Sequence, residues 1–389
     1  MQLPSHSDVS LRSKASAAGG QPQSTVPSFK LIDDELGQVK KLIEERLAEA
    51  SEPVSRLLRN VSVCSGKMIR PGLVLLSYHA VREGSCPKGL TAKRAGNTEK
   101  SPGLRKPATS GGSAVSENHR NTHYDAICVA AIVELIHNAT LLHDDVIDGG
   151  QKRRGLPTVN TLRGNESAVL LGDFLLSKAF KICAELGPEI TNIVAGTAVR
   201  VCEGELRQVT ERQNWQLSES EYIDIITEKS AALFSSCCLV GGLLAGASET
   251  QILPLADFGL KAGIAFQITD DLLDIIGDES KTGKTLGRDI DKNKLTLAVI
   301  HLLRAVEKTE QSAVINSYLV NPEAHLEGEA RCQRESLVEM LGRLGSLEYA
   351  HRRAQEFVTK ARDALTELRE GQAKDALIET AKFFGERAI

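Results

Sequence analysis

Apolar residues recur at helical spacing along most of the chain. In residues 29–60, Leu36, Val39 and Ile43 lie three or four positions apart, which predicts an amphipathic helix. Residues 72–82 form a second apolar segment. From residue 124 onward the pattern predicts helices over 124–148, 166–186, 188–213, 219–247, 254–276, 290–306, 335–371 and 374–387. No alternation typical of strands competes with it, so the sequence predicts an all-α fold.

Composition supports this fold class. Ten of the 12 prolines lie before residue 190, and only Pro254 and Pro322 follow, so few helix breakers interrupt the second half of the chain. Aromatic residues make up only 4%, which argues against a β-rich fold. Hydrophobic residues make up 41% of the 389 residues, enough for a large core.

Two segments lack helical periodicity. Residues 1–28 are rich in Ser, Gly and Gln and predict a disordered tail, although Arg12 and Lys14 leave a transit peptide open. Residues 83–122 contain six Gly, five Ser and three Pro, with seven Lys or Arg against three Glu. This composition predicts a disordered loop inserted into one domain spanning 29–389. Contact of this loop with lipid headgroups is an alternative to a solvated loop.

Charge and cysteine content bear on the partners and the cellular compartment of the protein. The 47 basic and 51 acidic side chains give a net charge of −4, so nothing in the overall charge favours nucleic acid or an anionic membrane as a partner. No run of 18 apolar residues is present, and we expect no membrane-spanning helix. The eight cysteines contain no CxxC pair. They predict reduced, buried thiols and a cytoplasmic location.

Two acidic clusters carry the candidate chemistry. Asp144, Asp145 and Asp148 close one apolar helix, and the same spacing recurs at the end of another, in FQITDDLLD at 266–274. Residues four apart share a helix face, and carboxylates there suit Mg²⁺, which bridges to phosphate oxygens. Basic residues follow each cluster, at 152–154 and among 281–294. Together these features predict a site for a diphosphate with an apolar remainder.

These motifs resemble those of the trans-polyprenyl diphosphate synthases. The similar segments are GKMIRP (66–71), LLHDDVIDGGQKRRGLPTVN (141–160), GDFLLSKA (172–179), EKSAALF (228–234), FQITDDLLD (266–274) and GKTLGRDIDKNKLTL (283–297). Met68 and Asn293 depart from the common Arg and Gly, and neither change removes a motif carboxylate. The resemblance implies the isoprenoid synthase fold, a helical bundle around a deep cavity. It also implies a homodimer, with peripheral membrane contact for product release.

The resemblance further implies a role for each matching residue. Metal binding falls to Asp144, Asp148 and Asp270, holding Mg²⁺ as three ions when diphosphate is bound. The catalytic carboxylates Asp145, Asp271 and Asp274 support them. The allylic diphosphate is contacted by Arg153, Lys229, Gln267 and Lys284. Isopentenyl diphosphate is held by Lys67, Arg70, His137 and Arg154. The implied reaction is ionisation, condensation and elimination, which makes the protein a prenyltransferase.

Product length is read from the helix that precedes the first cluster. Short-chain members of the family often carry a bulky aromatic four or five residues before the first aspartate, where this chain has Thr140 and Ala139. Ile136 lies about 12 Å below Asp144 at 1.5 Å per residue. We therefore expect a long-chain product, unless Phe174 or Phe180 closes the tunnel.

Several alternatives remain open at this stage. One is a short-chain farnesyl or geranylgeranyl synthase. Another is the non-catalytic subunit of a heteromeric synthase, although such subunits usually lose the aspartates that are intact here. A terpene cyclase would not need GKMIRP or the pair Arg153–Arg154. A lipid-binding protein would leave both acidic motifs unexplained.

Overall fold

The computed structural model describes residues 26–59, 66–85, 121–277, 286–319 and 327–386. Its elements up to the first cluster are η1 (Pro27–Ile32), α1 (Asp33–Ala48), α2 (Glu52–Leu58), α3 (Ile69–Ser85) and α4 (Thr122–Ile147). The middle of the chain forms β1 (Lys152–Arg153), β2 (Leu156–Pro157), α5 (Val159–Arg163), α6 (Asn165–Cys183), α7 (Pro188–Thr210), α8 (Glu219–Ile226), η2 (Thr227–Ala231), α9 (Ala232–Leu244) and α10 (Glu249–Ile276). The rest comprises α12 (Arg288–Asp291), α13 (Leu297–Ala305), α14 (Lys308–Val314), η3 (Ile315–Leu319), α15 (Glu327–Arg343), α16 (Ser346–Ala364) and α17 (Gln372–Glu386).

The central helix of the bundle is α4. The Asn121 side chain caps it by accepting a hydrogen bond from the Tyr124 N–H at 3.3 Å. Every residue from Ala126 to Ile136 is buried, which is the expected burial of a helix that is apolar all round. Glu134 is the one charged residue in this stretch, and the aspartates of the first cluster follow it at the end of the helix.

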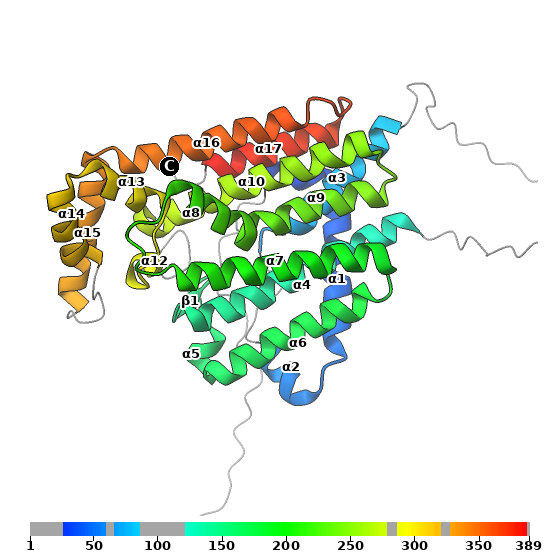
Figure 1. Ribbon diagram of the computed structural model, residues 1–389. Helices are drawn as coiled ribbons and strands as arrows, with labels where there is room; N and C mark the ends of the chain where they lie inside the picture. Colours follow the sequence, from blue (N-terminus) through cyan, green and yellow to red (C-terminus); the bar gives the residue numbers. More distant parts are fainter. Residues whose placement is uncertain (1–25, 60–65, 86–120, 278–285, 320–326, 387–389) are drawn as a thin grey trace, which may run out of the picture.

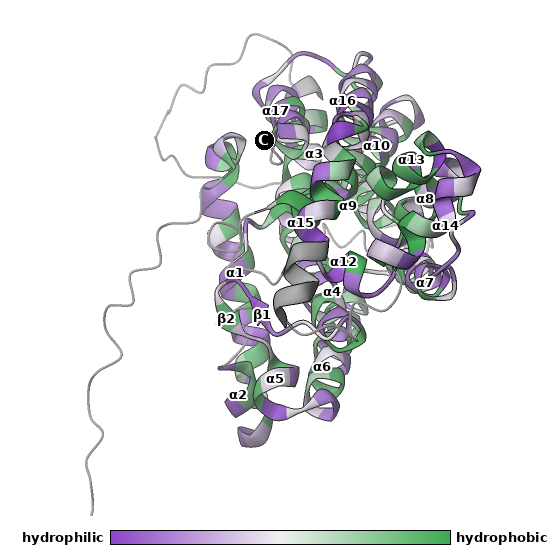
Figure 2. Cartoon of the chain, turned by 90° about the vertical axis from the view of Figure 1, so that its left-hand side faces the viewer, coloured by the Kyte–Doolittle hydropathy of each residue, from purple (hydrophilic) through white to green (hydrophobic). Residues whose placement is uncertain are grey.

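The other long helices surround α4 in layers. Helix α4 packs against α3 and α6, α3 packs against α9, and α10 packs against α9 and α16. Figure 1 shows these helices lying roughly side by side, while α1 crosses them and α13 to α15 extend from one end. Hydrophobic segments gather between the helices, and hydrophilic ones face outward (Figure 2). The ends of α4 and α10 that carry aspartates therefore lie at the margin of one core.

The structure confirms the all-α prediction and refines its boundaries. Packed chain begins before residue 29, because Val26 is buried and the hydroxyls of Ser28 and Thr380 lie 2.8 Å apart. Residues 83–85 and Thr122 belong to α3 and α4, whereas most of the predicted loop at 83–122 lies outside the described residues. The sequence missed α5, α14 and the two-residue strands β1 and β2. It also merged helices that the structure separates, α8 and α9 among them.

Two described helices, α4 and α10, are long and apolar enough to span a bilayer by length and composition alone. Within the bundle, 78% of the most apolar stretch of α4 is buried, and 50% of that of α10. Their apolar character therefore serves helix packing in this fold.

Candidate active site

A cavity of about 510 Å³ opens where α4, α7, η2, α9, α10 and α12 meet. Its size is typical of a small-molecule site. Twelve of the residues singled out in the sequence line it: Arg70, His137, Thr140, Asp144, Asp145, Asp148, Arg153, Lys229, Gln267, Asp270, Asp271 and Asp274. Lys284 lies outside the described residues. The chain thus brings both aspartate clusters, more than 120 positions apart, to one opening.

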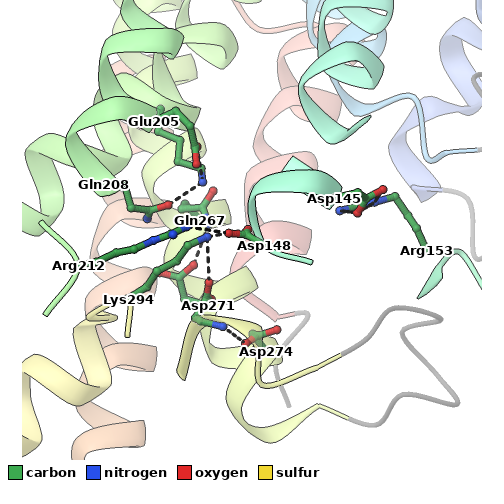
Figure 3. Close-up of polar contacts among 12 residues, drawn as sticks. Asp145, Asp148, Arg153, Glu205, Gln208, Arg212, Gln267, Asp271, Asp274 and Lys294 are labelled. Carbon is green, nitrogen blue, oxygen red and sulfur yellow. Dashed lines mark hydrogen bonds and ion pairs between the residues drawn. The ribbon is translucent and has the colours of Figure 1, made fainter. Parts of the chain in front are cut away.

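The carboxylates of the first cluster have different partners, although all of them line the cavity. Asp148, which caps α4, accepts hydrogen bonds from Arg212 at 3.1 Å and from Lys294 at 2.7 Å. Asp145 points the other way and receives Nε and Nη2 of Arg153, the shortest contact being 2.7 Å (Figure 3). Burial raises the pKa of Asp144 to about 6, although the charge of Lys229 opposes that shift. This carboxylate therefore lies where an added cation would stabilise its charged form.

The second cluster is held by protein donors in a similar way. Asp271 is buried and accepts from the Tyr222 hydroxyl at 2.6 Å and from Gln267 Nε2 at 2.8 Å. Burial raises the pKa of Asp271 to about 7. Asp274 accepts the backbone N–H of Asp289 at 3.1 Å, which ties α10 to α12 (Figure 3).

Lys229 reaches the aspartates from a widened helical turn. It lies in η2, a single π-helical turn between α8 and α9, a feature that often occurs at functional sites. Its Nζ contacts Glu205 at 2.6 Å and Gln208 at 2.7 Å, both on α7. Gly204 permits this approach, since a Cβ there would lie 2.2 Å from the Lys229 backbone N. Burial lowers the pKa of Lys229, but Asp144 and Glu205 outweigh it and raise the pKa, so the amine stays charged.

A group of basic residues lies beside the aspartate clusters. Arg70 stacks over the Phe234 ring at 4.9 Å, and its buried Nε has no hydrogen-bond partner among the described residues. Burial, together with Arg70 and Arg154, holds the pKa of His137 well below its ordinary value. Arg154 lies against Gly66, where a Cβ would come within 2.7 Å of its guanidinium. Lys67, the neighbour of Gly66, stacks over Phe383 at 4.7 Å.

The aspartate clusters and the group of basic residues differ in what they can bind. The first offers carboxylate oxygens around a cavity, a donor set that fits a hard divalent cation such as Mg²⁺. The second offers cations and a neutral imidazole in low-dielectric surroundings, which fits an anion that needs no metal. Lys67 and Arg154 do not line the main cavity, and Arg154 instead lines an adjoining hollow with Asn138 and Thr158.

The chain-length positions separate in the structure. Thr140 lines the cavity, whereas Ala139 and Ile136 are buried and do not line it. Neither Phe174, which is half-buried, nor Phe180, which is 50% exposed, lines the cavity.

Sequence reasoning missed three residues that hold the site together, namely Glu205, Arg212 and Tyr222. Glu205, Gln208 and Arg212 lie three and four positions apart on α7 and its end. That polar stripe in an otherwise amphipathic helix was a usable signal. Tyr222 had none, because its partner Asp271 is 49 positions away.

Comparison with known proteins decides the family. The family model for polyprenyl synthetase matches residues 51–333. The chain belongs to this family. A short chain isoprenyl diphosphate synthase of Methanothermobacter thermautotrophicus is 33% identical over 366 residues, covering 92% of this chain and 98% of that protein. The octaprenyl diphosphate synthase of Escherichia coli is 35% identical over 253 residues, covering 65% and 76%.

A solved structure agrees with the family. The polyprenyl synthase of Caulobacter crescentus, in complex with calcium and isoprenyl diphosphate, has a TM-score of 0.77 and 26% identity. The alignment covers 95% of this chain and 100% of that one. The chain is thus a prenyltransferase of the trans-prenyl diphosphate synthase class, with the isoprenoid synthase fold. Members of the family depend on Mg²⁺.

Proposed function

We propose that this enzyme condenses isopentenyl diphosphate head-to-tail with an allylic diphosphate to make a long-chain polyprenyl diphosphate. The observation that carries the chain-length part is the wall of α4 below Asp144. Thr140 and Leu141 are the residues that this helix presents to the cavity one turn before Asp144, and neither is aromatic. A growing apolar chain would pass this turn without meeting a Phe or Tyr side chain on α4.

The allylic diphosphate belongs at the two aspartate clusters in this proposal. Asp144, Asp148 and Asp270 would hold Mg²⁺, as three ions with diphosphate bound, and Asp145, Asp271 and Asp274 would support them. When bound, Mg²⁺ neutralises charge on the leaving diphosphate. Lys229, kept charged by its carboxylate neighbours, and Arg153 add positive charge on the protein side, together with Gln267 and Lys284.

Isopentenyl diphosphate belongs at the group of basic residues beside the aspartate clusters. The unpaired Nε of Arg70 supports this assignment, because a buried donor without a partner is costly until an anion arrives. His137 is neutral and offers a hydrogen bond without adding charge. Arg154 lies against Gly66, the neighbour of Lys67, and both basic residues belong to this group.

The reaction then follows from the placement of the two substrates. The allylic C–O bond breaks and its electron pair leaves with diphosphate. The double bond of isopentenyl diphosphate supplies the pair that forms the new C–C bond, and the released diphosphate takes the proton that is lost. Apolar lining by Leu233 and Phe266 keeps water from the carbocation.

We further propose a homodimer, which acts in the cytoplasm. Apolar side chains are exposed on the neighbouring helices α6 and α7: Leu170 is 66% exposed on α6, and Val199 is 57% exposed on α7. Exposed apolar residues on neighbouring elements often mark an interface. Buried free thiols, such as Cys237 and Cys238, support a reducing compartment. Leu170→Glu should shift the mass measured by light scattering from dimer to monomer, and an unchanged mass would reject this interface.

Product length is tested by incubating purified full chain with Mg²⁺, labelled isopentenyl diphosphate and farnesyl diphosphate, followed by chromatography. A ladder that ends at long polyprenyl chains is expected, and a C15 or C20 end product would refute the long-chain proposal. Thr140→Phe should shorten the product. Ala139→Phe, at the other position that the resemblance links to chain length, should shorten it too. Because Ala139 is fully buried, the stability of that variant is measured beside its product length. Absence of any incorporation would favour a subunit of a heteromeric synthase.

A further inference from the structure

Three helices bring metal-binding side chains together at the end of the bundle opposite the aspartates. Glu35 lies in the first turn of α1, His79 in α3 and His123 in the first turn of α4. His123 precedes Asp144 by 21 positions, about 31 Å along the helix. This group is distinct from the candidate active site and takes no part in the proposed reaction.

The three side chains converge on one point. Nε2 of His79 lies 2.7 Å from Oε1 of Glu35, and Nε2 of His123 lies 2.6 Å from the same oxygen. All three ligand atoms lie within 4.8 Å of one another. The side chains are 13% exposed for Glu35, 29% for His79 and 38% for His123, so an ion can reach them from solvent.

We propose that Glu35, His79 and His123 bind a transition-metal ion, with Zn²⁺ as the best chemical fit. Two imidazoles and one carboxylate are a common protein donor set for Zn²⁺, with water completing a tetrahedron. Imidazole nitrogen disfavours Mg²⁺, which takes oxygen ligands. The chain would then carry two classes of metal site, hard at the aspartates and borderline-soft here.

The geometry needs little adjustment for an ion. Metal–ligand bonds of about 2.0–2.1 Å in a tetrahedron place ligand atoms about 3.3 Å apart. Each histidine nitrogen would therefore move about 0.6 Å away from the Glu35 oxygen and give up its Nε2 proton. Tyr78 helps to fix both imidazoles, since its ring centroid lies 5.5 Å from that of His79 and 5.8 Å from that of His123.

The surrounding charges favour a cation. Burial alone would raise the pKa of Glu35, but hydrogen bonds from His79 and His123 outweigh it and lower the pKa, so the carboxylate is charged. Glu83 also acts electrostatically on His79. It is not itself a ligand, because its Oε2 accepts the backbone N–H of Ala373 at the start of α17. A bound ion would tie α1 to the end of α3 and the start of α4, the two helices that flank residues 86–120.

The test uses full-length protein with its affinity tag removed. The protein is first stripped of metal with a chelator and then loaded with Zn²⁺. Excess Mg²⁺ is present so that it occupies the aspartates. The protein is then gel-filtered and its metal content is measured. Wild type and the control His351→Gln should retain about one Zn²⁺ per chain. The double variant H79Q/H123Q should retain less than about a tenth as much, because it lacks two of the three ligands. Equal retention by the double variant, or no retention by wild type, would overturn the proposal.

Two further measurements guard against a variant that misfolds. Zn²⁺ should raise the thermal unfolding midpoint of wild type, because the ion binds the folded chain, and should leave that of E35Q unchanged. X-ray absorption at the zinc edge of wild type should show two imidazoles and no thiolate. A sulfur ligand would assign the ion to cysteines and reject this site.

Discussion

Tyr222 offers a sharp test of how the second aspartate cluster works. Its hydroxyl donates to Oδ2 of Asp271 at 2.6 Å inside the core, where burial raises the pKa of Asp271 to about 7 and this hydrogen bond opposes the rise. Tyr222→Phe keeps the ring and removes the donor. The ionised form of Asp271 loses a stabilising partner, so its pKa should rise further.

The size of the effect follows from the hydrogen bond. A bond to a charged group contributes about 1.5–3 kcal/mol, and 1.36 kcal/mol corresponds to one pH unit. The acid limb of the activity profile should therefore move upward by about one to two pH units. Asp271 would go from about half ionised at pH 7 to roughly a tenth or a hundredth ionised, which predicts an activity loss of about 5- to 50-fold there.

The assay is kcat/KM for isopentenyl diphosphate incorporation as a function of pH at a fixed Mg²⁺ concentration below saturation. Tyr349→Phe is the matched control, because that hydroxyl also donates to a carboxylate, Glu219, and neither residue lines the cavity. The variant Y222F should recover activity at high pH, and Y349F should follow wild type throughout. A Y222F profile that overlays wild type would show that the charge of Asp271 is not needed for the reaction.

Three other predictions follow from the site. Gly204→Ala should destabilise the chain by about 1–3 kcal/mol in urea unfolding, since its Cβ would collide with the Lys229 backbone, whereas Gly196→Ala on the same helix meets nothing within 4 Å and should be neutral or stabilising. Mg²⁺ affinity measured by calorimetry should fall from about pH 8 to about pH 6, with protons released on binding, because the pKa values of Asp144 and Asp271 are raised to about 6 and about 7. Without metal, the raised pKa values mean that the folded state holds these protons more tightly than the unfolded state. The chain should therefore lose stability as pH rises from the ordinary aspartate range through about 7, and Mg²⁺ should reverse that loss.

The sequence alone was enough to predict most of the long helices and the two helix faces that carry aspartates. Residues 126–136 are apolar at every position except Glu134, and so long an apolar run fits a buried helix. Helical geometry then places Asp144 and Asp148 on one side. Proline and glycine marked the break between α6 and α7 at Gly187 and Pro188.

The remaining features depend on contacts that no local pattern encodes. The π turn at 227–231 has no composition of its own and arises where η2 packs on Gly204 of α7. The strands β1 and β2 are two residues each, too short for alternation to show. Glu35, His79 and His123 come from three separate helices, and each taken alone is an ordinary surface residue.

The middle aspartate of each cluster shows how distant contacts divide a symmetric motif. In an α-helix the residue after the first aspartate is turned by about 100° from the face shared by the first and last. In both clusters a protein donor waits in that direction: Arg153 for Asp145, and Tyr222 with Gln267 for Asp271. Both middle carboxylates are therefore positioned by these donors, although all six aspartates line the cavity. The three aspartates of each motif look equivalent in the sequence, yet the fold gives the middle one a protein donor that the motif itself does not reveal.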